Sequence, residues 1–283
     1  MVIHIKTKDR DGNLLEGNGL LFYAKKQDGS FYATMYDGTV CDFPLILTLW
    51  HVVGLRQEDN PGYNLTNPNL TQFAEFRIPG LPGYTYIQEV VDKFPLSQID
   101  PPIASSDPTK EDGLCLLKPS PGFIPTVQSP TLLGIPHLDP VPILSMQVAI
   151  CFNQLQNDAA QFSFMPLGAQ PRKRGACDSY DYPGPQGFVG SGCSGSAILP
   201  NHRPNNPPEV VFGLHWGSRQ SPNPPNNYIF FGTQNVLTML RRSGYFYSPY
   251  DKRNRGESQT WLRRKAENFC RWALEKLTSP EGK

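Results

Sequence analysis

Short apolar runs separated by turn residues are the feature that most limits what this chain can fold into. Such runs occur at residues 20–23, 31–34, 45–48, 114–117, 146–152, 161–164, 196–199 and 210–213. Between them lie clusters drawn from 29 prolines and 25 glycines. Runs this short, at this spacing, are typical of antiparallel strands rather than of strands alternating with helices. The sequence therefore predicts an all-β protein with long loops.

The distribution of prolines and charges predicts three parts. The proline-rich stretch at 119–130 divides the β region into residues 1–125 and 126–248. Helical spacing is confined to the end of the chain, with a short helix expected at 234–242 and a longer one at 258–277. The tail, 249–283, is basic. An amphipathic helix packed on the body is one interpretation, and a helix that binds a partner or a membrane surface is the other.

Charge and cysteine usage exclude several functions. A net charge of +1 gives no general reason to expect a nucleic-acid partner. The six cysteines lack the short spacing of a metal knuckle, so we expect no metal and no other cofactor. No apolar stretch is long enough for a signal peptide or a membrane span. We therefore expect a cytoplasmic protein with reduced thiols and no membrane span.

The segment Gly192-Cys193-Ser194-Gly195-Ser196 is the strongest candidate for catalytic chemistry. A serine at the apex of a small-residue turn is accessible to a substrate. The backbone N–H groups of Gly192 and Ser194 could hold a developing oxyanion, a contribution worth about 3 kcal/mol per donor. A plain Gly/Ser turn is the alternative.

A serine nucleophile needs a base and the base needs an orienting group, and candidates for both lie upstream. His51 follows the apolar run ending at Trp50, and Asp112 precedes the run at 114–117. A part-buried aspartate needs hydrogen-bond donors, and the Nδ1–H of His51 would supply one. The alternatives are a packed histidine and a capping aspartate. Glu111 and Asp107 are rivals for the acidic role.

The chain at this point resembles the chymotrypsin-like serine proteases, whose catalytic residues follow the order His, Asp, Ser. The similar segments are Thr48-Leu-Trp-His51-Val-Val, Asp112-Gly-Leu-Cys-Leu-Leu, Gly192-Cys-Ser-Gly-Ser-Ala and Gly17-Asn18-Gly19-Leu20-Leu21. The resemblance covers residues 14 to 245. It implies two six-stranded antiparallel β-barrels, with His51 and Asp112 in the first and Ser194 with the specificity pocket in the second.

A finer resemblance is to the glutamyl endopeptidases, through Ser194-Gly195-Ser196 and Gly213-Leu-His-Trp-Gly-Ser218. It implies that the backbone of residues 215–217 pairs with the substrate, with Trp216 and Gly217 shaping that strand. It also implies that His215 lines the primary pocket and favours Glu or Gln before the scissile bond. The pocket wall has Val189 where that branch has a hydroxyl.

Cys193 distinguishes the chain from the digestive members of the family. They have an aspartate there that pairs with a newly cut N-terminus, so we expect no activation step of that kind. Cys193 is not followed by glycine, as a cysteine nucleophile of this fold would be, so we interpret it as a packed small side chain. The expected function is a serine endopeptidase acting on protein or peptide substrates, with a rate that rises from mildly acidic to neutral pH.

Functions of other classes stay open. One is a catalytically silent protease-like binding module. A second is a scaffold that works through a partner of the basic tail. An α/β-type esterase is disfavoured, because it needs the order Ser, Asp, His and a glycine where Ser196 stands.

Overall fold

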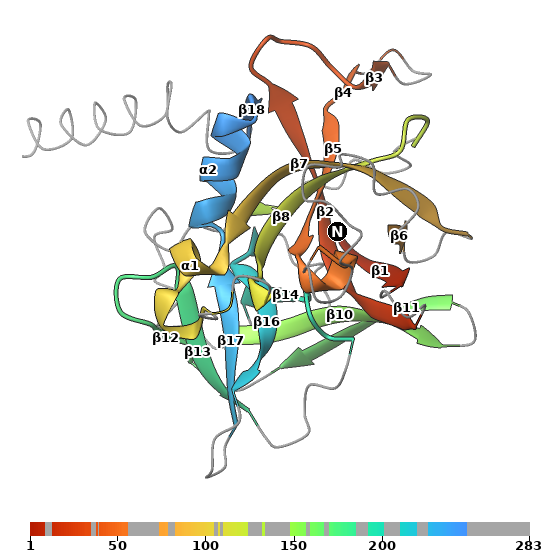
Figure 1. Ribbon diagram of the computed structural model, residues 1–283. Coiled ribbons are helices and arrows are strands. Elements are labelled where there is room, and N and C mark those ends of the chain that lie inside the picture. Colours follow the sequence, from red (N-terminus) through yellow and green to blue (C-terminus); the bar gives the residue numbers. More distant parts are fainter. Residues whose placement is uncertain are drawn as a thin grey trace, which may run out of the picture.

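The described part of the chain folds into two large curved β-sheets and two small two-stranded ones (Figure 1). In the computed structural model it comprises residues 1–8, 13–34, 38, 40–55, 74–78, 83–104, 107, 110–123, 132–133, 148–156, 159–166, 170–184, 192–200, 210–219 and 226–247. The predicted helix at 258–277 and the tail 249–283 lie outside these residues. No helix in this described part is long and apolar enough to cross a membrane.

The first sheet is a closed barrel of six strands, because β1 pairs with β6 on one side and with β2 on the other. In spatial order, the strands are β1 (Val2–Lys8), β6 (Ala74–Arg77), β7 (Thr85–Pro95), β8 (Gly113–Pro119), β5 (Phe43–Leu49) and β2 (Leu14–Lys26). The short strand β18 (Tyr245–Phe246) adds to the outer side of β2, so the chain returns to the first barrel near its end.

The second sheet has seven strands and is curled but open. In spatial order they are β11 (Ala159–Pro166), β10 (Val148–Gln156), β14 (Ala197–Pro200), β16 (Gly213–Arg219), β17 (Asn226–Gly232), β13 (Ser179–Gly184) and β12 (Arg172–Lys173). Within the described ranges no pairing joins β11 to β12. The edge strand β12 has only two residues, which is too short a ladder to close the sheet.

One closed barrel and one curled half-barrel give the chymotrypsin-like fold that the resemblance implied. The all-β prediction is confirmed, as is the first six-stranded barrel. The second sheet, as far as the described residues show it, is a curled half-barrel of seven strands rather than a closed barrel of six. The remaining short elements are β3 (Ala33–Thr34), β4 (Val40–Cys41), η1 (His51–Val53), α1 (Leu96–Ile99), η2 (Pro101–Ile103), β9 (Leu132–Leu133) and β15 (Val210–Val211).

The short helix predicted at 234–242 is confirmed as α2 (Gln234–Arg242). Its buried face presents Val236, Met239 and Leu240 to the core. The Asp178 carboxylate accepts the N–H of Gln234 at 2.8 Å, which satisfies one of the unpaired donors of the first turn.

The pairing of β5 with β8 decides where the site forms. Both strands are apolar and almost wholly buried. Their antiparallel register places Leu49 opposite Leu114. The residues just after β5 and just before β8 therefore meet at one edge of the barrel, and these are His51 and Asp112.

Candidate active site

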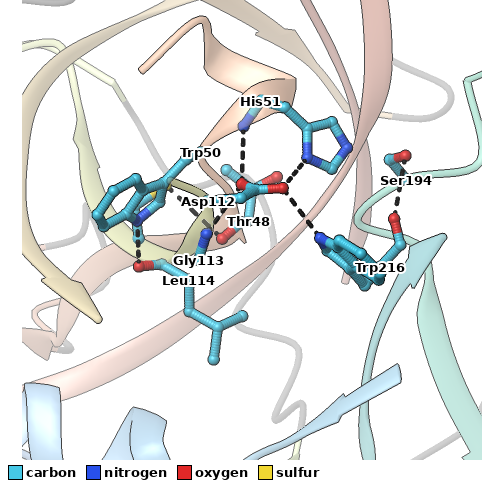
Figure 2. Close-up of polar contacts among 9 residues, drawn as sticks. Thr48, Trp50, His51, Asp112, Gly113, Leu114, Ser194 and Trp216 are labelled. Atoms are coloured by element: carbon cyan, nitrogen blue, oxygen red, sulfur yellow. Dashed lines mark hydrogen bonds and ion pairs between the residues drawn. The ribbon is translucent and has the colours of Figure 1, made fainter. Parts of the chain in front are cut away.

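His51 and Asp112 form a direct hydrogen-bonded pair. The His51 Nδ1 atom lies 2.7 Å from Asp112 Oδ2, and the His51 backbone N–H donates to Oδ1 at 3.3 Å (Figure 2). Trp50, the residue before His51, is fixed to β8 because its indole Nε1–H donates to the Leu114 carbonyl at 2.7 Å. The rival Glu111 accepts the Ser97 N–H at 3.0 Å instead. His51 keeps about a quarter of its side chain exposed (23%), whereas Asp112 is buried.

The Asp112 carboxylate accepts four hydrogen bonds. Besides the two from His51, the Gly113 N–H donates to Oδ1 at 2.8 Å and the Trp216 indole Nε1–H donates to Oδ2 at 2.9 Å. Burial by itself would raise the pKa of Asp112. The charge of His51 and these hydrogen bonds outweigh burial and lower that pKa to about 2. The carboxylate is therefore ionised at neutral pH.

An ionised carboxylate can only accept, so the proton of the His51–Asp112 bond sits on Nδ1. A neutral His51 ring then leaves Nε2 as a hydrogen-bond acceptor, which is the state a general base requires. Figure 2 shows the His51 ring lying between the Asp112 carboxylate and Ser194.

Trp216 takes part in the site in a way that sequence reasoning missed. The resemblance implied that it shapes the substrate strand, yet its indole donates to the Asp112 carboxylate. It lies on β16, which belongs to the other sheet. No spacing in the sequence relates residues 104 positions apart in this way. Trp216 thus links the expected substrate strand to the His51–Asp112 pair.

Ser194 stands at the apex of a tight turn between the two sheets. Gly192 and Gly195 on either side have φ of +91° and +79°, a left-handed region that only glycine enters readily. At Gly195 a Cβ would also lie 1.9 Å from the Asn18 carbonyl oxygen. The two glycines of the motif are therefore required by the backbone that presents the hydroxyl.

Ser194 and His51 are not yet joined in this structure. The Ser194 hydroxyl donates weakly to the Trp216 carbonyl at 3.5 Å, and within the described residues no hydrogen bond connects it to His51. Catalytic hydrogen bonds are often long or misaligned without substrate and tighten when substrate binds.

The backbone N–H groups of Gly192 and Ser194 have no acceptor within the described part of the chain. The neighbouring groups are occupied: Gly195 N–H donates to the His215 carbonyl at 2.8 Å, and Ser196 N–H donates to the Cys193 carbonyl at 3.1 Å. Among the described residues the two predicted oxyanion donors therefore have no other partner, while the neighbouring N–H groups hold the turn in place.

His215 is buried on β16 among aromatic rings of the second sheet. The Tyr182 hydroxyl lies 2.7 Å from His215 Nδ1, and the Tyr228 ring centroid lies 6.0 Å from that of His215. Burial, aided by the charge of His51, lowers the pKa of His215 to about 3. The imidazole is therefore neutral at neutral pH. Tyr182 is a second residue that sequence reasoning missed.

The other predicted site residues fall as follows. Gly217 lies on β16 just beyond a register shift, and a Cβ there would meet nothing within 4 Å. Val189 lies outside the described residues. Cys193 is buried in the core of the second sheet. No group of three or more His, Cys, Asp or Glu side chains gathers as a metal site would require, in the part of the chain that the structure describes.

Three solved structures illustrate what this chain is similar to. The protease of tobacco vein mottling virus is 12% identical, with a TM-score of 0.49 over 87% of this chain and 83% of that one. The Rv3671c protease of M. tuberculosis in its active form is 14% identical, with a TM-score of 0.47 over 87% and 82%. An inactivated protease paralogue of the scabies mite is 10% identical, with a TM-score of 0.44 over 84% and 89%.

No protein-family model and no curated protein matches the chain. The solved structures above include an active and an inactivated protease, at TM-scores below 0.5. What the site can do therefore follows from its own residues.

Proposed function

We propose that this protein is a serine endopeptidase. Ser194 attacks the scissile carbonyl while His51 Nε2 takes the hydroxyl proton, and the resulting imidazolium is stabilised by the Asp112 carboxylate. The N–H groups of Gly192 and Ser194 hold the oxyanion. His51 then passes the proton to the leaving amine, and water repeats the sequence to release the acyl group.

The observation that supports this most is the His51–Asp112 pair at 2.7 Å beside the Ser194 turn. The Asp112 carboxylate is buried, ionised and held by four donors. In this environment it can orient the His51 imidazole and stabilise the positive charge that the ring gains as a base. A purely structural aspartate would not require a partly exposed histidine as its hydrogen-bond partner.

The free side of β16 suits an extended peptide. Its pairing with β14 ends at Leu214, and the N–H and carbonyl of His215 still bond to the Ser196 carbonyl and the Gly195 N–H. From Trp216 onward the strand has no ladder partner on that side among the described residues. A substrate could add there as a further strand, its backbone bonding to Trp216 and Gly217 rather than to His215, whose backbone groups are occupied. The Trp216 carbonyl accepts a hydrogen bond from the Ser194 hydroxyl in the free protein and would instead accept a substrate N–H. The released hydroxyl would then donate to His51.

A fluorophosphonate probe is expected to label the wild-type protein at Ser194. Labelling should disappear in Ser194→Ala and in His51→Ala, because the hydroxyl needs its base. Peptide cleavage should fall by a factor on the order of 10⁶ in Ser194→Ala. Intact-mass spectrometry of the labelled protein provides the measurement.

Cys193→Ala is the matched control for that experiment, since it removes the adjacent nucleophilic side chain and leaves the hydroxyl. It should retain labelling. A wild-type protein that neither labels nor cleaves a peptide library would support the binding-module alternative instead. Loss of activity in Cys193→Ala with activity retained in Ser194→Ala would assign the nucleophile to the thiol.

We further propose that the pocket prefers Gln over Glu. A neutral imidazole donates one N–H, which a carboxamide oxygen accepts without any net charge entering the pocket. A Glu carboxylate would enter beside His215, Tyr182 and Tyr228, none of which carries a positive charge at neutral pH. An unpaired buried charge is costly.

Paired peptides that differ only in Gln or Glu before the scissile bond test this preference. We expect kcat/KM at neutral pH to favour Gln by roughly tenfold or more, which corresponds to about 1.4 kcal/mol. The control is His215→Leu, in which both peptides should become poor and nearly equal. Equal rates for both peptides in the wild type would show that His215 does not read the side chain.

A further inference from the structure

Asn18 crosses from the first barrel to the nucleophile turn, residues 192–195. It lies on β2, and its backbone N–H donates to the Ser194 carbonyl at 2.7 Å. Its side-chain Nδ2–H donates to the Gly192 carbonyl at 2.8 Å. The residue is fully buried (0% exposed), so water does not compete for either bond. One residue of the first barrel thus holds two carbonyls of the turn.

These two bonds complete a set that orients the turn. The Cys193 carbonyl between them accepts the backbone N–H and the hydroxyl of Ser196. Because a peptide unit is planar and trans, holding that carbonyl also fixes the direction of the Ser194 N–H on its opposite side. The three carbonyls of residues 192, 193 and 194 are all occupied. The N–H groups proposed to bind the oxyanion are not, within the described residues.

Gly192 is the residue of the turn whose backbone conformation is least restricted by its own side chain. It has no side chain and a φ of +91°, so its own conformational preferences do little to fix the peptide that follows it. If that peptide turned over, its carbonyl oxygen would leave the first barrel and could face the site. An oxygen lone pair there would repel the oxyanion that the N–H groups should stabilise. The amide of Asn18 opposes this rotation.

Asn18 also connects to the strand that carries the base. Its backbone carbonyl accepts the Thr48 hydroxyl at 2.7 Å, and Thr48 lies on β5 three residues before His51. The same carbonyl is in such close approach to Gly195 that a Cβ there would lie 1.9 Å away. Asn18 is therefore wedged between the strand leading to the base and the turn carrying the nucleophile.

We propose that Asn18 is a positioning residue that keeps the nucleophile turn competent to bind an oxyanion. This inference rests on the proposed peptidase function of the same site. Asn18 does not contact the reacting atoms; it acts through the Gly192 and Ser194 carbonyls. Its effect should therefore fall on the transition state, with substrate binding in the ground state left almost unchanged.

Asn18→Leu tests the proposal, because leucine has a similar size and no donor. We expect kcat to fall by about 10²-fold with little change in KM. Affinity for a peptide boronate, which adds to the serine as a transition-state mimic, should fall by a similar factor, whereas affinity for the matching product peptide should not. Asn18→Ala provides a second variant in case the leucine side chain disturbs folding.

Ser179→Ala is the matched control. The Ser179 hydroxyl on β13 donates to Asp100 at 2.6 Å, a buried bond between the two halves of the molecule that does not involve the turn. This variant should lose thermal stability yet keep the wild-type kcat and boronate affinity. Equal losses in Ser179→Ala and Asn18→Leu would reduce Asn18 to a general structural role and overturn the proposal.

Amide hydrogen exchange over residues 192–196 supplies a readout that does not depend on activity. We expect faster exchange there in both Asn18 variants and unchanged exchange in Ser179→Ala. If the Asn18 variants exchange faster but the wild-type protein has no peptidase activity, the positioning role of Asn18 is upheld and the peptidase function is rejected. If the wild-type protein is active and a folded Asn18→Leu protein has the same kcat, the positioning role of Asn18 is rejected and the peptidase function is retained.

Discussion

Replacing Asp112 by asparagine is expected to lower kcat by about 10⁴-fold while KM changes little. The carboxylate now accepts the Nδ1–H of His51 at 2.7 Å, which leaves Nε2 free to take the serine proton. An asparagine amide can donate to Nδ1 and so favours the tautomer with the proton on Nε2, which cannot act as a base. The variant also loses the charge that stabilises the imidazolium. Steady-state kinetics on one peptide measures both parameters.

Two further variants serve as comparisons, one expected to leave kcat unchanged and one expected to lower it by less. Glu111→Gln changes the neighbouring carboxylate, which accepts the Ser97 N–H and has no bond to His51, so kcat should stay close to that of the wild type. Trp216→Phe removes one of the four donors to Asp112 and should reduce kcat by roughly tenfold, as expected for a hydrogen bond to a charged group. An Asp112→Asn protein with nearly wild-type kcat would remove the pair from the mechanism.

The stability of the protein is expected to depend on pH through His215. Burial lowers the pKa of this imidazole from 6.5 to about 3, so below pH 6.5 the unfolded chain binds a proton at this position that the folded chain does not. The contribution of His215 to stability is therefore fully present above pH 6.5 and is lost as the pH falls toward 3. The slope is about 1.4 kcal/mol per pH unit across this window.

Urea unfolding of the wild type and of His215→Gln at a series of pH values measures this slope. Other groups titrate equally in both proteins, including Asp112, whose contribution is present above pH 3.8 and lost as the pH falls toward 2. The difference between the two free energies of unfolding should therefore shrink or reverse as the pH drops below 6.5. Parallel curves for the two proteins would show that His215 does not titrate as proposed.

Tyr182→Phe is the control for that series. It removes the hydroxyl that lies 2.7 Å from His215 Nδ1 but leaves the imidazole buried. Because burial is the main reason for the lowered pKa, Tyr182→Phe should retain most of the pH dependence that His215→Gln loses. The pair of variants separates the titrating group from its hydrogen-bond partner.

Local patterns accounted for most of the strands and for the His51–Asp112 pair. Apolar runs bounded by turn residues predicted β5 and β8, and the polar residues at their ends, His51 and Asp112, met because the strands pair in antiparallel register. The helix at 234–242 followed from its apolar spacing. Each of these features depends on neighbours in the chain or on one strand pairing.

The missed features depend on contacts between distant segments. Trp216 reaches Asp112 across 104 positions, and Asn18 reaches Gly192 across 174. A tryptophan on an apolar strand and an asparagine between two glycines carry no local mark of such partners. The open second sheet was missed for a similar reason, because closure depends on the lengths of edge strands that the sequence does not delimit.

The sequence alone thus determined the all-β class, the order His, Asp, Ser and the turn that presents Ser194, because alternation, turn residues and glycine geometry act over a few residues. Only the tertiary structure decided that the carboxylate is held by four donors, that His215 is neutral, and that Asn18 joins the two sheets. Burial and the direction of hydrogen bonds are properties of packed surfaces, and those surfaces exist only once the two sheets have come together.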